Sequence, residues 1–191
     1  MWNHVMRMSV CFLIVSGVVG VFTLQAQQDD GPLGLRWGMS NTDVEALGVR
    51  LCCKQVGKWG ARYEIEEDAL KNLPNPLGDE NKVYLYFGNM NQLLRVYIDI
   101  VKRDGRNRYN QINTILESKY TFQDGCARRE EKYTQLQKDE TCGDYYGYAN
   151  YTRDAVKAFV GLERFTQSDR VSIVLLHDKL YEVDQKRKGP L

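Results

Sequence analysis

The sequence predicts an α+β protein whose helices pack on one face of antiparallel β-sheet. Three observations indicate this class: apolar and polar residues alternate along several short segments, turn residues join these segments into hairpins, and one longer segment repeats its apolar residues every three or four positions. The composition agrees, because 43% of the 191 residues are hydrophobic and 27% are charged, as in an ordinary globular protein.

The first half of the domain, residues 27–104, is expected to combine a short helix with two hairpins. Ser40 or Asn41 can cap the helix, and Gly48 ends it. A loop that begins with one helical turn is expected at residues 68–79, where prolines gather. The predicted strands span residues 49–56, 59–66, 83–87 and 93–101.

The order of elements then repeats, which indicates a second, tandem helix-plus-sheet unit over residues 105–184. A helix is expected over residues 107–120, because Tyr109, Ile112 and Leu116 recur at helical spacing. The other expected elements are a strand at 133–137, a hairpin formed by 156–165 and 170–177, a short helix or fraying strand at 178–183, and a loose basic tail at 185–191.

Residues 1–26 have the features of an export signal. Arg7 gives a positive start, and the apolar stretch from Met8 to Phe22 is shorter than the roughly 20 residues of a membrane-spanning helix. Ala26 is a small residue just before a polar segment, so cleavage is expected near it; the alternative is an uncleaved anchor helix. We therefore expect a periplasmic or secreted protein with no stable membrane anchor after cleavage.

The charge balance argues against binding to nucleic acid. There are 26 Lys and Arg residues against 25 Asp and Glu residues, a net charge of +1, and cleavage of the signal would remove Arg7. Nucleic-acid-binding proteins usually carry a basic surplus, and a neutral chain is not steered toward anionic lipid either. The expected partner is instead another protein.

Four cysteines follow the signal, and an even number in an exported chain indicates disulfides. We expect a disulfide between Cys126 and Cys142, which flank a polar stretch, because closing a loop of about 15 residues is worth roughly 3 kcal/mol. Cys52 and Cys53 are adjacent, and adjacent side chains of a strand point to opposite faces. A vicinal disulfide, one buried thiol, an intermolecular bond and long-range pairing with Cys126 and Cys142 all remain open for them.

Few residues suit catalysis. His177 is the one histidine after the signal, and Asp178 beside it could orient it as the general base of a hydrolase. The sequence lacks a nucleophile-elbow motif, a phosphate-binding loop and the spaced cysteine and histidine pairs of zinc sites. We expect no enzymatic activity, no metal and no cofactor.

Aromatic residues are the best candidates for binding. All 12 tyrosines follow the signal, and several gather just before the last hairpin. Tyrosine and tryptophan combine a large contact area with a polar tip, which suits protein interfaces, although packing against the sheet is the alternative. The candidate contact residues are Trp37, Trp59, Tyr145, Tyr146 and Tyr148. Because such rings also stack on sugars, the second expectation is a glycan- or small-molecule-binding protein.

The segment Leu35–Gly48 resembles the opening of small bacterial envelope proteins: an apolar residue, Gly, Met, Ser or Thr, a short acidic stretch, Val, and then Leu-Gly. It is similar to the start of the accessory lipoprotein of the outer-membrane barrel-assembly machinery and of β-lactamase-inhibitor-protein-like domains. The resemblance implies a helix-then-sheet fold that binds other proteins through sheet faces and loops. We therefore expect an exported, non-enzymatic envelope protein that acts as an inhibitor or assembly accessory.

Overall fold

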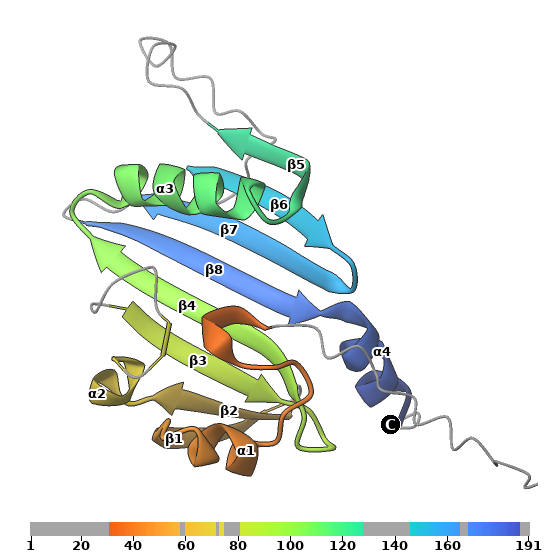
Figure 1. Cartoon of the computed structure of the whole chain (residues 1–191). Coiled ribbons are helices and arrows are strands. Elements are labelled where there is room, and N and C mark those ends of the chain that lie inside the picture. The colour runs from red at the N-terminus through yellow and green to blue at the C-terminus, as the bar shows by residue number, and fades with distance from the viewer. Residues whose placement is uncertain are drawn as a thin grey trace, which may run out of the picture.

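An antiparallel sheet of eight strands dominates the structure, which is a computed structural model (Figure 1). The residues that it describes are 31–57, 60–71, 73–74, 81–127, 146–164 and 168–187. Across the sheet the strands follow the order β1-β2-β3-β4-β8-β7-β6-β5. Their bounds are β1 Leu51–Gly57, β2 Gly60–Ile65, β3 Asn81–Phe87, β4 Leu93–Lys102, β5 Thr121–Ala127, β6 Gly147–Arg153, β7 Val156–Arg164 and β8 Asp169–His177.

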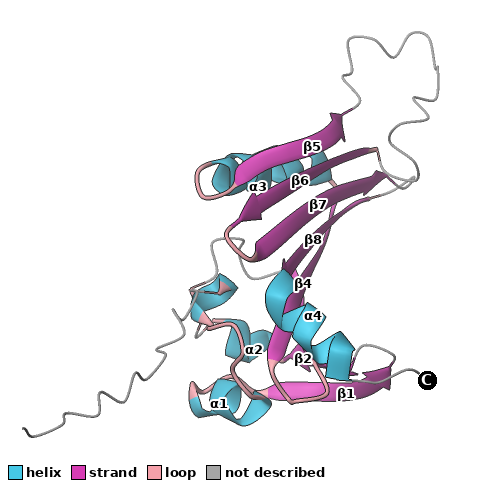
Figure 2. Cartoon of the chain, turned by 90° about the vertical axis from the view of Figure 1, so that its right-hand side faces the viewer, coloured by secondary structure: helices cyan, strands magenta, loops and turns pink. Residues whose placement is uncertain are grey.

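Three short helices lie before or between the first strands, the longest helix separates β4 from β5, and another helix follows the last strand. Their bounds are η1 Pro32–Gly34, α1 Asn41–Ala46, α2 Glu67–Leu70, α3 Gly105–Glu117 and α4 Asp178–Arg187. Helix α3 contacts β4, β6, β7 and β8, while α4 contacts β4 and β8 (Figure 2). In the part of the chain that the structure describes, no helix combines the length and apolar character needed to cross a membrane. The predicted class, a mixed α+β fold dominated by antiparallel sheet, is confirmed.

The two halves that the sequence predicts contribute to this one sheet. The first half supplies β1 to β4 and the second supplies β5 to β8, and the halves join where β4 pairs with β8. In this pairing Tyr97 lies opposite Val174, and Ile98 lies opposite Ile173. Because directly opposite residues of antiparallel strands share a face, this register fixes which side chains of the two halves meet.

The side chains of the sheet alternate between two environments. In β4, Val96, Ile98 and Ile100 are at most 2% exposed, whereas Tyr97 and Asp99 between them are partly exposed. The face that carries Val96, Ile98 and Ile100 is here called the inner face, and the opposite one the outer face. The buried residues of α3 belong to the same hydrophobic cluster as the inner face. This alternation is the pattern from which the strands were predicted.

Different contacts set the beginnings of α1 and α3, a local one for α1 and a long-range one for α3. Ser40 and Asp43 form a capping box: the Ser40 hydroxyl accepts from the Asp43 amide, at 3.1 Å, and the Asp43 carboxylate accepts from the Ser40 amide, at 2.9 Å. Helix α3 begins at Gly105, earlier than the expected residue 107. A Cβ atom at Gly105 would lie 2.2 Å from the Cβ of Asp169, so only glycine allows this close approach of α3 to β8.

Helix α4 is longer than expected. The loose tail predicted for residues 185–191 is wrong at residues 185–187, which continue α4. Asp184 anchors this end of the helix: it is 1% exposed, and its carboxylate accepts from the backbone amide of Asn89, at 2.7 Å, and from the Asn89 side chain, at 2.9 Å. Lys186 and Arg187 in the last turn also suit the negative end of the helix dipole.

Strands β5 and β6 were not predicted. The inner positions of β6 include Gly147 and Ala149, and its outer positions include Asn150 and Thr152, so the apolar alternation is weak. Small residues suit this place because α3 lies over them, and the Tyr109 hydroxyl oxygen would be 3.5 Å from a Cβ at Gly147. The predicted strand at residues 133–137 and the export signal at residues 1–26 lie outside the described residues.

Candidate functional site

A cluster of tyrosines and arginines covers the outer face of β2, β3, β4 and β8. The cluster, here called the aromatic–arginine face, consists of Arg62, Tyr84, Tyr86, Arg95, Tyr97 and Arg170, and each of these residues is partly exposed. The strand register brings them together, because Arg62 pairs with Tyr86, Tyr84 with Tyr97, and Tyr86 with Arg95. Tyrosine and arginine are among the residue types that are enriched in protein interfaces and in their binding hot spots.

The arginines of β2 and β4 lie over tyrosine rings. The guanidinium of Arg62 is 4.8 Å from the ring centroid of Tyr84, and that of Arg95 is 5.0 Å from the centroid of Tyr86. The rings of Tyr84 and Tyr97 lie 5.8 Å apart, at an angle of 40°. Partial burial raises the pKa of Tyr84. These contacts hold flat side chains in place before any partner arrives, which lowers the entropy lost on binding.

Arg170 is held by the other polar groups of the same face. Its Nε and Nη2 atoms donate to the two carboxylate oxygens of Asp99, at 2.8 and 2.7 Å. Nη2 also lies 3.4 Å from the Tyr97 hydroxyl, which is 3.1 Å from the Ser172 hydroxyl. The hydrogen bond to Asp99 is the largest cause of a raised pKa of Arg170. This network fixes the centre of the face.

The outer face continues into β6 and β7. Tyr97 pairs with Val174, and Val174 pairs with Phe159, so these three side chains share the face. Tyr148 stacks on Phe159 with ring centroids 6.3 Å apart. The structure therefore brings the sequence candidate Tyr148 onto the same side of the sheet as the aromatic–arginine face.

The other sequence candidates lie elsewhere. Trp37 is 7% exposed and belongs to the core, where its ring meets that of His177 edge to face at 5.8 Å. Tyr146 is partly buried and packs against the core. These positions favour packing over partner contact for both residues, because a partner must reach the side chains that it binds. Trp59 and Tyr145 lie outside the described residues.

Sequence reasoning missed the residues of the aromatic–arginine face, although a signal for them was present. In β3 and β4, Tyr84, Tyr86, Arg95 and Tyr97 occupy every second position. Residues two apart on a strand share a face, so this spacing places tyrosine and arginine opposite the apolar side. The apolar positions alone predict these strands, and the register that joins the polar positions of different strands into one surface is not visible in the sequence.

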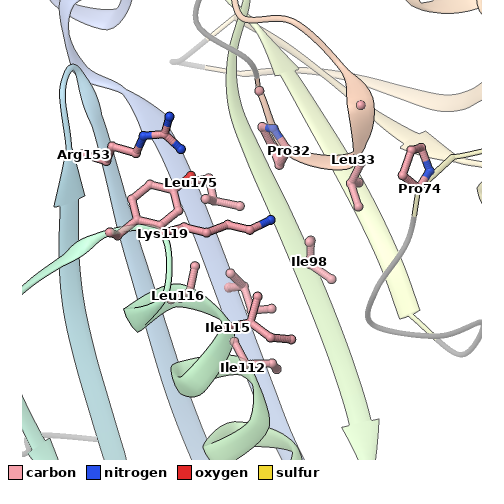
Figure 3. Close-up of a pocket in the computed structure, with 14 residues that line it drawn as sticks. Pro32, Leu33, Pro74, Ile98, Ile112, Ile115, Leu116, Lys119, Arg153 and Leu175 are labelled. Atoms are coloured by element: carbon pink, nitrogen blue, oxygen red, sulfur yellow. The ribbon is translucent and has the colours of Figure 1, made fainter.

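A second feature is a cavity of about 760 Å³ above the inner face of β4 and β8 (Figure 3). Its apolar wall comes from four elements, η1, β4, β8 and α3: Leu33, Ile98, Ile112, Ile115, Leu116, Ile173 and Leu175. Lys119 and Arg153 also line it, and in Figure 3 the Lys119 side chain reaches from the end of α3 toward the segment of Pro32 and Leu33. Among the described residues that line it, none is acidic.

His177 caps α4. It is 8% exposed at the end of β8, and its Nδ1 atom accepts from the backbone amide of Leu180, at 3.3 Å. The adjacent carboxylate of Asp178 forms an ion pair with Lys157, at 2.7 Å. The imidazole thus satisfies an amide of the first helical turn, which is a structural use of this side chain. In the described part of the chain, no group of three or more His, Cys, Asp and Glu residues is placed to hold a metal ion.

The cysteines differ in their bonding. Cys126 is disulfide-bonded, and Cys142, its expected partner, lies outside the described residues. Cys52 and Cys53 in β1 are free thiols. Their Sγ atoms are nevertheless only 3.0 Å apart.

Comparisons with protein-family models, with curated proteins and with solved structures found no match to this chain. The resemblance of Leu35–Gly48 to small envelope proteins therefore stays an expectation.

Proposed function

We propose that this protein is exported to the bacterial envelope, acts without catalysis, and binds another protein through the aromatic–arginine face. The observation that carries the proposal is the cluster of partly exposed tyrosines and arginines on the outer face. Helices that pack only on the inner face would leave this surface open. Two tandem helix-plus-sheet units, residues 27–104 and 105–184, would then build it jointly across the pairing of β4 with β8.

The charges of the face favour a partner that presents carboxylates. Arg170 already holds Asp99, and Lys82 lies 3.7 Å from Glu64. Among the described residues, neither Arg62 nor Arg95 forms an ion pair, although Arg62 donates to the Gln55 side chain. A guanidinium over an aromatic ring keeps donors available for a carboxylate, and charge-assisted bonds of this kind are among the strongest at interfaces.

Site-specific photocrosslinking in the cell envelope tests this proposal. A photoreactive amino acid replaces Tyr86 on the outer face or, as a control, Thr114 on the exposed side of α3. We expect one dominant protein adduct from position 86 and none of the same mass from position 114. Equal adducts from both positions, or none from position 86, would show that the face is not the binding surface.

Binding between the purified proteins then tests the charge argument. Arg95→Glu places a negative charge where the partner's carboxylate is expected, so affinity should fall by about 2 kcal/mol or more, as for hot-spot residues. Arg103→Glu makes the same charge change at an exposed position between β4 and α3 and should leave affinity nearly unchanged. Equal effects of the two variants would contradict a role specific to the face.

The cavity favours a second candidate function, the binding of a small amphipathic anion. An apolar cavity of about 760 Å³ is in the size range of ligand sites, and Lys119 and Arg153 could hold a carboxylate head group. A fluorescent fatty acid provides the probe. Lys119→Glu should weaken its binding, and Glu117→Lys, which adds a cation at an exposed position nearby, should not. Among the residues that the structure describes, no comparable feature favours glycan binding or a hydrolase that uses His177.

A further inference from the structure

Strand β1 contains a bulge at its two cysteines. Cys52 pairs with Glu64, and the next paired residue is Gln55, opposite Arg62, so Cys53 and Lys54 have no paired residue in β2. The φ angle of Cys53 is +56°, in the left-handed region that residues with a side chain rarely adopt. Adjacent side chains of a regular strand point to opposite faces. Here the bulge instead brings the Sγ atoms of Cys52 and Cys53 to 3.0 Å.

These two thiols are also accessible. Among the strands that the structure describes, β1 lies at an edge of the sheet, with β2 as its one neighbour. Cys52 is partly exposed and Cys53 is exposed. Free cysteines are usually among the most buried residues, and reactive cysteines are typically accessible. A strained backbone at an exposed edge, with two sulfur atoms nearly in contact, therefore requires an explanation other than packing.

We propose that Cys52 and Cys53 form a redox-sensitive site, which closes reversibly to a vicinal disulfide by exchange with a small-molecule disulfide. Consecutive Cα atoms lie about 3.8 Å apart, below the range of about 4.4–6.8 Å usual for disulfides. A bond between adjacent residues is consequently strained, and strained or exposed disulfides are the ones that reduce readily. This site differs in that respect from a structural disulfide.

The exchange proceeds in two steps. The thiolate of Cys53, the more exposed of the two, attacks a disulfide RSSR, forms a mixed disulfide and releases one RS⁻. The thiolate of Cys52 then attacks the Cys53 sulfur, which breaks the mixed bond, closes the ring and releases the second RS⁻. The cysteine pair loses two electrons and two protons, while RSSR is reduced to two RSH.

The surroundings of Cys52 fit the role of the second thiol. Its hydrogen bond with Cys53, followed by burial and by the negative charges of Cys53, Glu64 and Glu66, raises the pKa of Cys52 to about 11. Once Cys53 is in a mixed disulfide, the contribution of its thiol to that shift is gone, and Cys52 deprotonates more easily. The geometry brings Cys52 within reach of the sulfur that it must attack.

The test uses the purified full chain in its native state. The protein is equilibrated over a series of ratios of oxidised to reduced glutathione, quenched with acid, alkylated under denaturing conditions and analysed by peptide mass. At reduced ratios we expect the peptide that carries both cysteines to be alkylated on two thiols. At oxidised ratios we expect it to be unalkylated, with a mass two hydrogens below that of the free dithiol peptide. Reduced ratios should reverse the change, and Cys126 should stay bonded throughout.

Three variants separate this site from ordinary thiols. Cys53→Ser and Cys52→Ser should each stop at one glutathione on the remaining cysteine. The third variant exchanges two residues, Cys53→Lys together with Lys54→Cys, and so keeps the composition. It moves the second thiol to position 54, where the Lys54 side chain of the unchanged protein lies over Tyr63, with its Nζ atom 5.7 Å from the ring centroid. This variant should lose the lighter form and carry two glutathiones. A covalent dimer, two glutathiones on the unchanged protein, or no reaction at any ratio would overturn the proposal.

Discussion

The two faces of the β4–β8 strand pair differ in almost every physical respect. On the inner face, Ile98 and Ile173 lie opposite each other and are 2% and 3% exposed, within the hydrophobic core. On the outer face, Tyr97 and Arg170 are partly exposed and form hydrogen bonds with their neighbours. Residues one position apart along the same strand therefore serve stability on one side and surface chemistry on the other.

This difference shows how a single sheet can provide both a core and a binding surface. Because the side-chain period of a strand is two, inner and outer positions can change independently as long as the register is kept. A shift by one residue would bring Arg95, Tyr97 and Asp99 against α3 and expose Val96 and Ile98. The burial of aliphatic residues on the inner face thus holds the tyrosines and arginines in place on the outer one.

The largest expected effect on stability comes from Leu85→Ala on β3, compared with Tyr86→Ala at the next position, whose side chain points to the opposite face. Leu85 is fully buried on the inner face, so Leu85→Ala should lower the free energy of unfolding by about 2–5 kcal/mol through lost burial and a cavity. Tyr86→Ala removes a partly exposed side chain and should cost about 1 kcal/mol or less. Urea unfolding measures both. Similar losses for the two variants would show that the outer face is also a packed core.

A smaller effect is expected at the buried carboxylate of α4. Asp184→Ala leaves the amide and side chain of Asn89 without their acceptor, which should cost about 1–3 kcal/mol. Glu182→Ala is the matched control, because Glu182 is exposed on the same helix and should change stability little. Hydrogen exchange should show faster exchange along α4 in the first variant only. Unchanged protection there would contradict the anchoring role of Asp184.

Tyrosine ionisation compares the two faces at alkaline pH. Burial, and then the negative charge of Glu117, raises the pKa of Tyr151 on the inner face, where its hydroxyl donates to Asn113 at 2.8 Å. A folded pKa above the unfolded value of 10.0 means that this stabilisation is complete below pH 10 and is lost as the pH rises above it. Tyr151→Phe should cost about 1 kcal/mol at neutral pH and flatten the alkaline loss.

The matched change on the outer face is Tyr84→Phe. Its pKa is also raised by burial, but Tyr84 is only partly buried, so this variant should alter the alkaline loss less than Tyr151→Phe does. Denaturant unfolding between neutral pH and the alkaline range gives the comparison. A steeper loss in the Tyr151→Phe variant than in the unchanged protein would reverse the argument.

The strength of local patterns decided how much of the fold the sequence could predict. Both strong hairpins and α1 were predicted because alternation, turn residues and the capping residue Ser40 all act locally. Strand β6 was missed because Gly147 and Ala149 give its inner side little apolar signal, and a Cβ at Gly147 would already contact Tyr109 of the distant helix α3. The end of α4 was missed for a similar reason, since Asp184 is held by Asn89, which lies 95 positions earlier.

The candidate surface was harder to predict than the fold. The sequence drew attention to tyrosines that are close in the chain, such as Tyr146 and Tyr148. Tyr148 lies on the outer side of β6, whereas Tyr146 precedes this strand and packs against the core. The aromatic–arginine face instead joins residues of β2, β3, β4 and β8, which only the register of the sheet brings together. The short distance between the Cys52 and Cys53 sulfur atoms likewise depends on a β-bulge that no sequence pattern predicts.

The smallest expected effect concerns the ion pair of the outer face. Arg170 and Asp99 form a bidentate contact, but the Arg170 side chain is 38% exposed, so water and salt weaken the interaction. A double-mutant cycle with Arg170→Ala and Asp99→Ala should give a coupling of about 0.2–1 kcal/mol that decreases as salt is added. A coupling several times larger and insensitive to salt would mean that this pair is as buried as the aliphatic residues behind it. The outer face would then be part of the core, and the distinction between a stabilising face and a binding face would fail at its centre.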